Sequence, residues 1–166
     1  RNLVGCDPFL GSEETQDRLV GLVGQRQCGD RELLAGLQRG EGGAFLVDVG
    51  PKSSASELEK VETMVQAAKN QVAEILTGGH RLVDGLFSRG HWYEPTVMTV
   101  NDNAMKIMQE EIFGPVVPVM IVEDFDEGLR LANESQYGLS AYVFTKDMRR
   151  MMRLVRELKF GEIYVN

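Results

Sequence analysis

Two adjacent carboxylates stand directly before an aromatic residue and a Gly-Pro turn in residues 110–115. The acids are Glu110 and Glu111, and Phe113 is the aromatic residue. A carboxylate accepts several hydrogen bonds at once, so it can bind the vicinal hydroxyls of a ribose. Paired glutamates at a helix end are more often solvated surface groups. The segment therefore predicts either a ligand-binding turn beside a strand end or an ordinary surface turn.

Two cysteines, Cys6 and Cys28, are the only thiols in the chain. A thiolate is a strong nucleophile, but only where its surroundings lower the pKa of the thiol. Nothing in the neighbouring residues predicts such surroundings, so an ordinary thiol is the favoured interpretation and Cys28 is kept as the candidate nucleophile. A disulfide is disfavoured, because two thiols in a chain of intracellular character are usually free.

The composition is that of a globular chain of about one domain, with 166 residues, 43% hydrophobic and 26% charged. A net charge of −7 offers no positive field to a phosphate backbone, so we expect no nucleic-acid partner. The longest apolar run, residues 116–122, is far shorter than the roughly 20 residues that span a bilayer, which predicts no membrane segment. The first residues form no apolar secretion signal, and residue 1 is not Met. Both features favour a cytoplasmic chain that is truncated. His80 and His91 lack companion ligands at metal spacing, so no metal site is expected.

The first fifty residues differ from the rest in composition. They hold ten of the eighteen glycines and contain no Lys, Met, Tyr or Trp. Glycine supplies backbone freedom rather than packing surface. We therefore expect residues 1–49 to form an irregular leader, with a short helix at 30–37 and a short strand at 44–49, and residues 50–166 to form the organised domain.

A long helix is predicted over residues 57–76, because apolar residues recur there every three or four positions. Ser56 and Glu59 would form a capping box at its start, and Gly78-Gly79 would end it. The residues predicted to form its buried face are Leu58, Val61, Val65, Ala68, Val72 and Ile75.

Strands and helices alternate through the remainder of the chain. Apolar and β-branched runs predict strands at 92–100, 116–122, 139–144 and 160–165. Pro95 predicts that the first of these is either an edge strand or a strand that begins after the proline. Helices are predicted at 103–110, 124–133 and 148–158. This alternation predicts an α/β fold with a mostly parallel sheet and flanking helices. The apolar face predicted to pack the last helix into the core is Met148, Met151, Met152, Val155 and Leu158.

Residues 110–116, Glu-Glu-Ile-Phe-Gly-Pro-Val, resemble the cofactor-contacting motif of the NAD(P)-dependent aldehyde dehydrogenase superfamily. Five further features resemble the same family in the same order: Pro51 with the helix after it, and residues 76–79, 93–97, 131–141 and 160–166. One such match is weak evidence, but several independent motifs in order are strong evidence. The resemblance covers residues 50–166 and implies part of the family's catalytic domain.

The resemblance implies a specific chemistry. In this family an ionised cysteine attacks the carbonyl of a small-molecule aldehyde, hydride passes to the nicotinamide, and a glutamate-activated water releases the carboxylic acid. By similarity Glu111 would hold the ribose hydroxyls of NAD or NADP, and Phe113 would pack near the nicotinamide. Parent enzymes of the family commonly assemble as homo-oligomers.

The chain differs from the family in the segments that carry the catalytic nucleophile and the general base. Residues 24–28 superficially resemble the family's Gly-Gln-x-Cys nucleophile motif, but one residue too many separates Gln25 from Cys28. The family's Glu-Leu-Gly-Gly segment with its general base is not found, nor is the cofactor domain. We therefore expect an aldehyde dehydrogenase fragment that is inactive in isolation. The alternative is a non-catalytic α/β interaction module that pairs through exposed strand edges.

Overall fold

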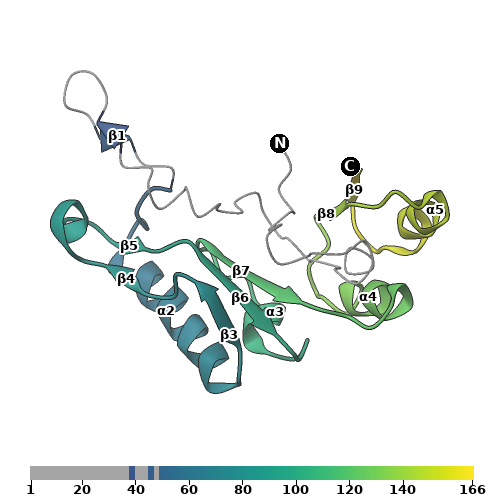
Figure 1. The fold of residues 1–166 in the computed structure, drawn as a ribbon, viewed down its shortest axis with the longest axis horizontal. Coiled ribbons are helices and arrows are strands. Elements are labelled where there is room, and N and C mark those ends of the chain that lie inside the picture. The colour runs from purple at the N-terminus through teal and green to yellow at the C-terminus, as the bar shows by residue number, and fades with distance from the viewer. Residues whose placement is uncertain (1–37, 40–44, 47–48) are drawn as a thin grey trace. The chain divides into compact units, whose positions relative to one another are not determined.

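The computed structural model describes residues 38–39, 45–46 and 49–166, and Figure 1 shows their ribbon. The predicted helix at 30–37 and both cysteines, Cys6 and Cys28, lie outside the described residues. The described core divides into two compact units. One contains residues 49–100 and 104–118, and the other contains residues 101–103 and 119–166. Before them, the short strands β1 (Gln38–Arg39) and β2 (Phe45–Leu46) pair antiparallel, the second of them within the predicted 44–49.

The first unit is built on helix α2 (Ala55–Asn70). Its N-cap is Ser54, whose side chain accepts a hydrogen bond from the backbone N of Glu57 at 3.2 Å. The capping box predicted at Ser56 and Glu59 is therefore wrong by two residues, since the cap that satisfies a free N–H of the first turn is Ser54. The predicted apolar face is confirmed over the first four turns, where the buried residues are Leu58, Val61, Met64, Val65 and Ala68.

Helix α2 ends at Asn70, about a turn and a half before the predicted end. Val72 adopts the left-handed conformation at φ 69° and is 80% exposed. Ala73 then donates its N–H to the carbonyl of Ala68 at 3.0 Å, which closes the last turn. Residues Glu74–Thr77 form strand β3, so Ile75 belongs to the sheet. A short apolar strand can continue a helical spacing by coincidence, and periodicity alone does not separate the two.

The sheet of the first unit has the order β3-β6-β7, with β6 (Thr96–Val100) in the centre and β7 (Val116–Met120) at one side. Strand β6 begins directly after Pro95, which confirms one of the two predicted alternatives, and its central position shows that the edge-strand alternative is wrong. Met98 is completely buried. Before the proline, β5 (Trp92–Tyr93) pairs with β4 (Arg81–Leu82), and the 3-10 helix η2 (Gly85–Ser88) connects the two. Helix α3 (Lys106–Gln109) packs on α2 and is shorter than predicted.

The second unit contains helices α4 (Phe125–Ala132) and α5 (Met148–Glu157). The predicted limits of α4 are confirmed: Asp124 caps it by accepting from the backbone N of Glu127 at 2.8 Å, and Asn133 ends it. Asp147 caps α5 by accepting from the backbone N of the next two residues. These backbone N–H groups lower the pKa of Asp147 below its ordinary value.

The α/β class is confirmed, but the pairing directions are mixed rather than mostly parallel. Strands β8 (Ser140–Val143) and β9 (Glu162–Val165) are parallel, and α5 supplies the crossover between them. Strands β3 and β6 are antiparallel, with Ile75 opposite Met98. A parallel pair needs a long crossover that is usually helical, whereas only β4, η2 and β5 lie between β3 and β6. The antiparallel direction of β3 and β6 is therefore explained by the lack of a helical crossover between them.

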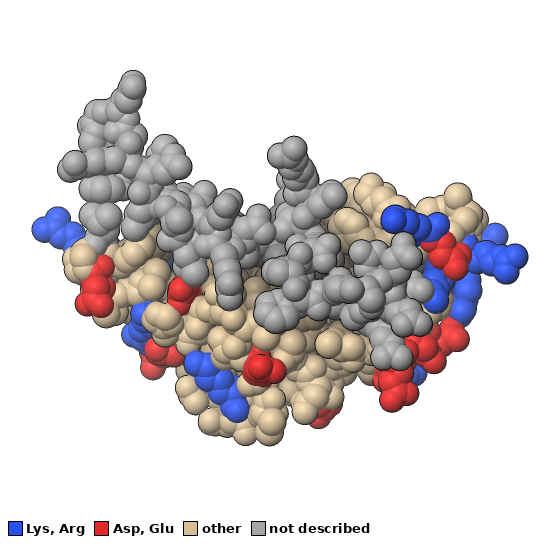
Figure 2. Space-filling model, in the orientation of Figure 1, with Lys and Arg blue, Asp and Glu red and all other residues tan. Residues whose placement is uncertain are grey.

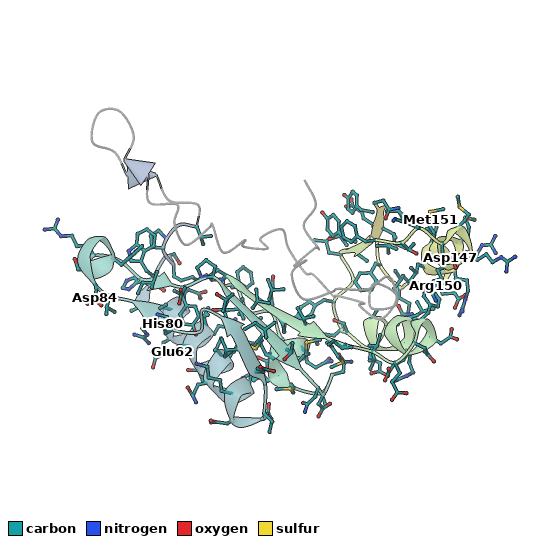
Figure 3. All side chains as sticks on the ribbon, in the orientation of Figure 1. Glu62, His80, Asp84, Asp147, Arg150 and Met151 are labelled. Carbon is teal, nitrogen blue, oxygen red and sulfur yellow. The ribbon has the colours of Figure 1, made fainter. Side chains whose placement is uncertain are left out.

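The prediction that α5 packs its apolar face into a core is wrong for the part of the chain that the structure describes. Met148 is 65% exposed, Met152 42% and Val155 48%. The helix instead contacts α4 through Arg153, whose guanidinium lies 2.8 Å from Asp126 and 5.0 Å from the ring centroid of Phe125. Figure 3 labels Asp147, Arg150 and Met151 along this helix. Ion pairs and cation-π contacts hold the two helices together without burying the methionines.

The surface carries both signs of charge. Figure 2 shows acidic and basic side chains intermixed on the visible face of the described residues. None of the described helices is long and apolar enough to cross a membrane. The same residues contain no group of three His, Cys, Asp or Glu side chains arranged for a metal ion.

A polar cluster lies between α2 and the β4-β5 hairpin, and Figure 3 labels two of its members, Glu62 and His80. Arg81 pairs with Glu62, and His80 Nδ1 lies 3.0 Å from a carboxylate oxygen of Glu94. Tyr93 is only 5% exposed, and its hydroxyl has no hydrogen-bond partner among the described residues. Burial, with a further contribution from Glu62, raises the pKa of Tyr93 to about 12. The cluster therefore contains a phenol that resists ionisation.

The raised pKa of Tyr93 predicts a loss of stability at alkaline pH. Between pH 10 and about 12 the unfolded chain ionises this phenol while the folded chain does not, so the free energy of unfolding falls as the pH rises. Tyr93→Phe keeps the ring and removes the unpaired hydroxyl. We expect stability at pH 8 to be equal or higher and the alkaline decline to be smaller, as measured by urea denaturation.

Tyr137→Phe is the matched control, because it removes an exposed phenol from the other unit. If Tyr93→Phe instead lowers stability at pH 8 by several kcal/mol, the hydroxyl has a partner and the assignment is wrong.

Candidate functional site

The turn predicted from the sequence connects α3 to β7. Glu110 is the C-cap of α3, and β7 begins at Val116. Thr96 N donates to Pro115 O at 2.8 Å, so the beginnings of β6 and β7 lie side by side at the turn. The turn is therefore at the amino end of β7, whereas ligands of open α/β sheets usually lie beyond carboxyl ends. The sequence correctly predicts a turn beside a strand end, but the turn lies at the opposite end from the one that the fold rule favours for ligands.

The two adjacent acids have different surroundings. The carboxylate of Glu110 lies 3.5 Å from the ammonium of Lys106, one helical turn earlier. Glu111 is exposed, and its carboxylate forms no hydrogen bond or ion pair with any described residue. Its oxygens are therefore available to accept hydrogen bonds from a ligand. Of the predicted pair, only Glu111 is a free acceptor.

Phe113 has a backbone conformation that is rare for its residue type. Its φ of 52° is left-handed, and this costs a residue with a Cβ on the order of 1–3 kcal/mol. Its side chain is 55% exposed. The ammonium of Lys52 donates to its carbonyl oxygen, and the ammonium of Lys60 lies 5.6 Å from its ring centroid, within cation-π range. The surrounding residues thus fix the backbone while leaving much of the ring accessible.

Gly114 allows the turn to approach α2 closely. A Cβ at this position would lie 2.5 Å from Cγ2 of Val61, a distance that real Cβ atoms do not show. Val61 itself is fully buried. Because residue 114 has no side chain, the turn can pack directly against α2 at the position that follows the strained Phe113.

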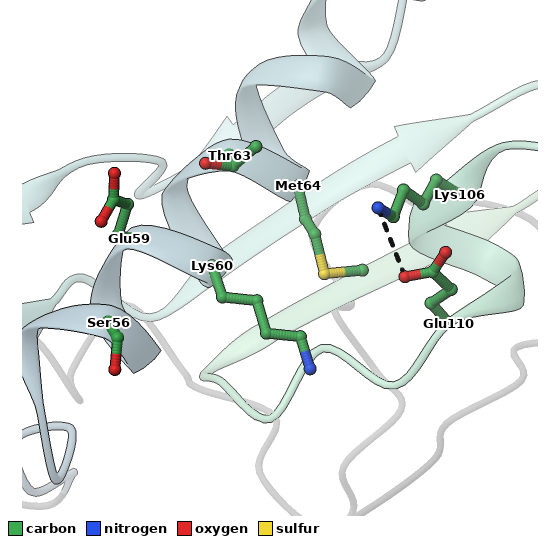
Figure 4. Close-up of a pocket in the computed structure, with 7 residues that line it drawn as sticks. All are labelled: Ser56, Glu59, Lys60, Thr63, Met64, Lys106 and Glu110. Atoms are coloured by element: carbon green, nitrogen blue, oxygen red, sulfur yellow. Dashed lines mark ion pairs between the residues drawn. The ribbon is translucent and has the colours of Figure 1, made fainter.

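A pocket of about 280 Å³ lies between α2 and α3, next to the turn. Figure 4 shows its lining, which is Ser56, Glu59, Lys60, Thr63, Met64, Lys106 and Glu110. Lys60 extends from α2 toward the segment that leads into β7, which agrees with its position over Phe113. Glu111 and Phe113 are not among the lining residues. The pocket therefore lies beside these two residues, and Lys60 contacts both the pocket and the ring of Phe113.

The sequence motif predicted Glu111 and Phe113 as cofactor-binding residues, but it did not predict the residues that contact this turn. Lys52, Lys60 and Val61 reach the turn only through tertiary contacts across about fifty to sixty residues, so no local spacing marks Lys52 or Lys60. Val61 was predicted as core, but its contact with Gly114 was not. The candidate nucleophile Cys28 lies outside the described residues, so the structure brings no thiol to the turn from the part it describes.

Comparison with known protein families decides between the two sequence hypotheses. The model of the family described as "Aldehyde dehydrogenase family" matches residues 31–166. The chain belongs to the aldehyde dehydrogenase family. The match includes the whole turn, both units and the described strands and helices.

Individual relatives agree with this assignment. A 3,6-anhydro-alpha-L-galactose dehydrogenase from Vibrio sp. (strain EJY3) is 43% identical over 119 residues, which are 72% of this chain and 25% of that protein. A structure of 3,6-anhydro-L-galactose dehydrogenase in complex with NAP is 45% identical, with a TM-score of 0.67 and the same coverage. A betaine aldehyde dehydrogenase structure from Staphylococcus aureus in complex with NAD+ is 39% identical, with a TM-score of 0.67, and the match covers 72% of this chain and 24% of that one. This aldehyde dehydrogenase chain thus spans about a quarter of the length of these relatives.

The close contact at Gly114 predicts a stability effect. Gly114→Ala would force the new methyl group into Val61, so either the helix or the turn must move. We expect the free energy of unfolding to fall by about 1–3 kcal/mol, as for other overpacked positions. Urea denaturation of the 166-residue chain measures this change.

Gly50→Ala is the control, because a Cβ at residue 50 meets nothing within 4 Å. Equal stability of the two alanine variants would show that the turn does not depend on the contact with Val61.

Proposed function

We propose that this chain supplies the cofactor-contacting turn of an NAD(P)-dependent aldehyde dehydrogenase. The observation that carries the proposal is the carboxylate of Glu111, which is exposed and has no partner among the described residues, two residues from the exposed ring of Phe113. Membership of the family supports it, as do the relatives solved with NAP and with NAD+. In this role Glu111 binds the hydroxyls of the nicotinamide ribose and Phe113 packs beside the nicotinamide.

The chemistry of the available groups fits a dinucleotide. Glu111 offers acceptors for a vicinal diol, and Phe113 offers an apolar face for an aromatic ring. Lys60 places a positive charge near the same ring, where a phosphate of the cofactor would be attracted. When bound, the nicotinamide accepts hydride from the substrate. The residues of this turn bind and orient the cofactor, and they do not break bonds.

The proposed overall reaction is the oxidation of a small-molecule aldehyde to a carboxylic acid. It requires a thiolate nucleophile and donors for the developing oxyanion, and the described residues contain no cysteine. We propose residues 50–166 as the catalytic-domain segment and residues 1–49, with Cys28, as a leader, of which residues 31–49 lie within the family match. We further propose a cytoplasmic location and assembly as a homo-oligomer, with NAD and NADP as equal candidates.

A chimera tests the proposed function. The 119-residue segment of the Vibrio relative that matches this chain is replaced by the corresponding segment of this chain. We expect the chimera to retain the dehydrogenase activity of that relative. In this background Glu111→Gln should weaken cofactor affinity about 10- to 150-fold, because a charge-assisted hydrogen bond to the ribose contributes roughly 1.5–3 kcal/mol. The KM for the cofactor and direct titration measure the effect.

The control is Glu123→Gln, which neutralises an exposed glutamate of the other unit. If Glu111→Gln leaves cofactor affinity unchanged while the melting temperature collapses, Glu111 is structural and the proposal fails.

The chain by itself should not turn over aldehydes. The motif of the nucleophile and the segment of the general base are not found in its sequence, and binding groups alone do not supply covalent catalysis. Purified 166-residue chain, mixed with NAD+ or NADP+ and a panel of aldehydes, should show no absorbance change at the wavelength of the reduced cofactor. Steady turnover would contradict this.

A further inference from the structure

We infer that Lys52 is a positioning residue that holds the Phe113 turn in the conformation used for cofactor contact. The inference rests on the proposed function and extends it to a residue outside the motif. Lys52 lies 61 residues before Phe113 in the sequence, yet its ammonium donates a hydrogen bond to the Phe113 carbonyl oxygen. This is a charge-assisted hydrogen bond, which is stronger than one between neutral groups.

The backbone of Lys52 is itself anchored. Its N–H donates to the carbonyl of His91 at 2.8 Å, and the two residues form an isolated antiparallel bridge. Ser54, the N-cap of α2, follows two residues later. Lys52 is also partly buried. Because the Cα of Lys52 is fixed by these neighbours, less conformational entropy is lost when its ammonium binds at the turn.

The turn has a conformation that needs support from outside. Phe113 is left-handed, which is unfavourable for a residue with a Cβ, so nearby contacts must stabilise it. The hydrogen bond from Lys52 fixes the peptide group between Phe113 and Gly114. The contact of Gly114 with Val61 fixes the next position, and Lys60 lies over the ring. All three supporting residues belong to one segment, residues 52–61.

The role of Lys52 predicts which kinetic constant changes on its removal. Lys52 contacts Phe113 through the backbone oxygen, so its effect on the cofactor passes through the position of the ring and of Glu111. Loss of the ammonium should therefore weaken cofactor binding and raise the KM for the cofactor, while kcat at saturating cofactor changes little.

The first test uses the 166-residue chain without any cofactor. Lys52→Met keeps an unbranched apolar side chain of nearly the same length and removes its donor. We expect the backbone amide signals of Phe113 and Gly114 to shift in the NMR spectrum, and Lys52→Arg, which restores a donor, to return them toward the original positions. Lys146→Met, an exposed lysine in the other unit, should leave both signals in place. Unchanged signals in Lys52→Met would overturn the inference.

The second test uses the chimera with NAD+ as the probe. Lys52→Met should raise the KM for NAD+ about threefold to tenfold, the range expected for one partly solvated hydrogen bond. Its kcat should stay close to that of the parent, its melting temperature should fall only slightly because one hydrogen bond is lost, and Lys52→Arg should recover most of the affinity. If Glu111→Gln weakens NAD+ binding but Lys52→Met does not, this inference fails and the proposed function stands. If Glu111→Gln has no effect, the proposed function fails, and the NMR test alone decides whether Lys52 holds the turn.

Discussion

The close approach of Gly114 to Val61 is the constraint on which the candidate site depends. It seats the turn before β7 directly on helix α2, at a distance that any side chain at residue 114 would prevent. Because Val61 is fully buried in a close-packed core, its contact with Gly114 restricts the movement of the turn relative to the helix. An exposed carboxylate and an exposed ring are thereby held on a firm support, which binding residues need if they are to act in a fixed geometry.

The segment that supports the turn is continuous in sequence. Residues 52–61 cover the approach to α2 and its first two turns, and they contribute a hydrogen bond, a cation-π contact and a packing contact to residues 113–114. The helix is positioned in turn by its Ser54 cap and its buried face. Under the proposed function, a substitution of Lys52 would alter the turn without removing a group that contacts the cofactor, and family motifs centred on Glu111 and Phe113 would not reveal it.

Local signals in the sequence predicted the α/β class, the limits of α4 and the start of β6 after Pro95, since caps and prolines act over a few residues. They failed where tertiary contacts decide. The end of α2 was misplaced because Ile75 continues a helical spacing from within a strand. The apolar face of α5 was assigned to the core, but α5 is held by Arg153. At the turn, the motif led to the prediction that Glu111 and Phe113 contact a cofactor, whereas the contact of Lys52 with Phe113 could come only from the structure.

We propose that this turn presents Glu111 and Phe113 to a nicotinamide cofactor. A crystal structure of the chimera with bound NAD+ would show whether the two side chains touch it. We expect the carboxylate of Glu111 to accept hydrogen bonds from the nicotinamide ribose and the ring of Phe113 to contact the nicotinamide. A structure with NAD+ well ordered and both side chains out of contact with it would rule out this role of the turn.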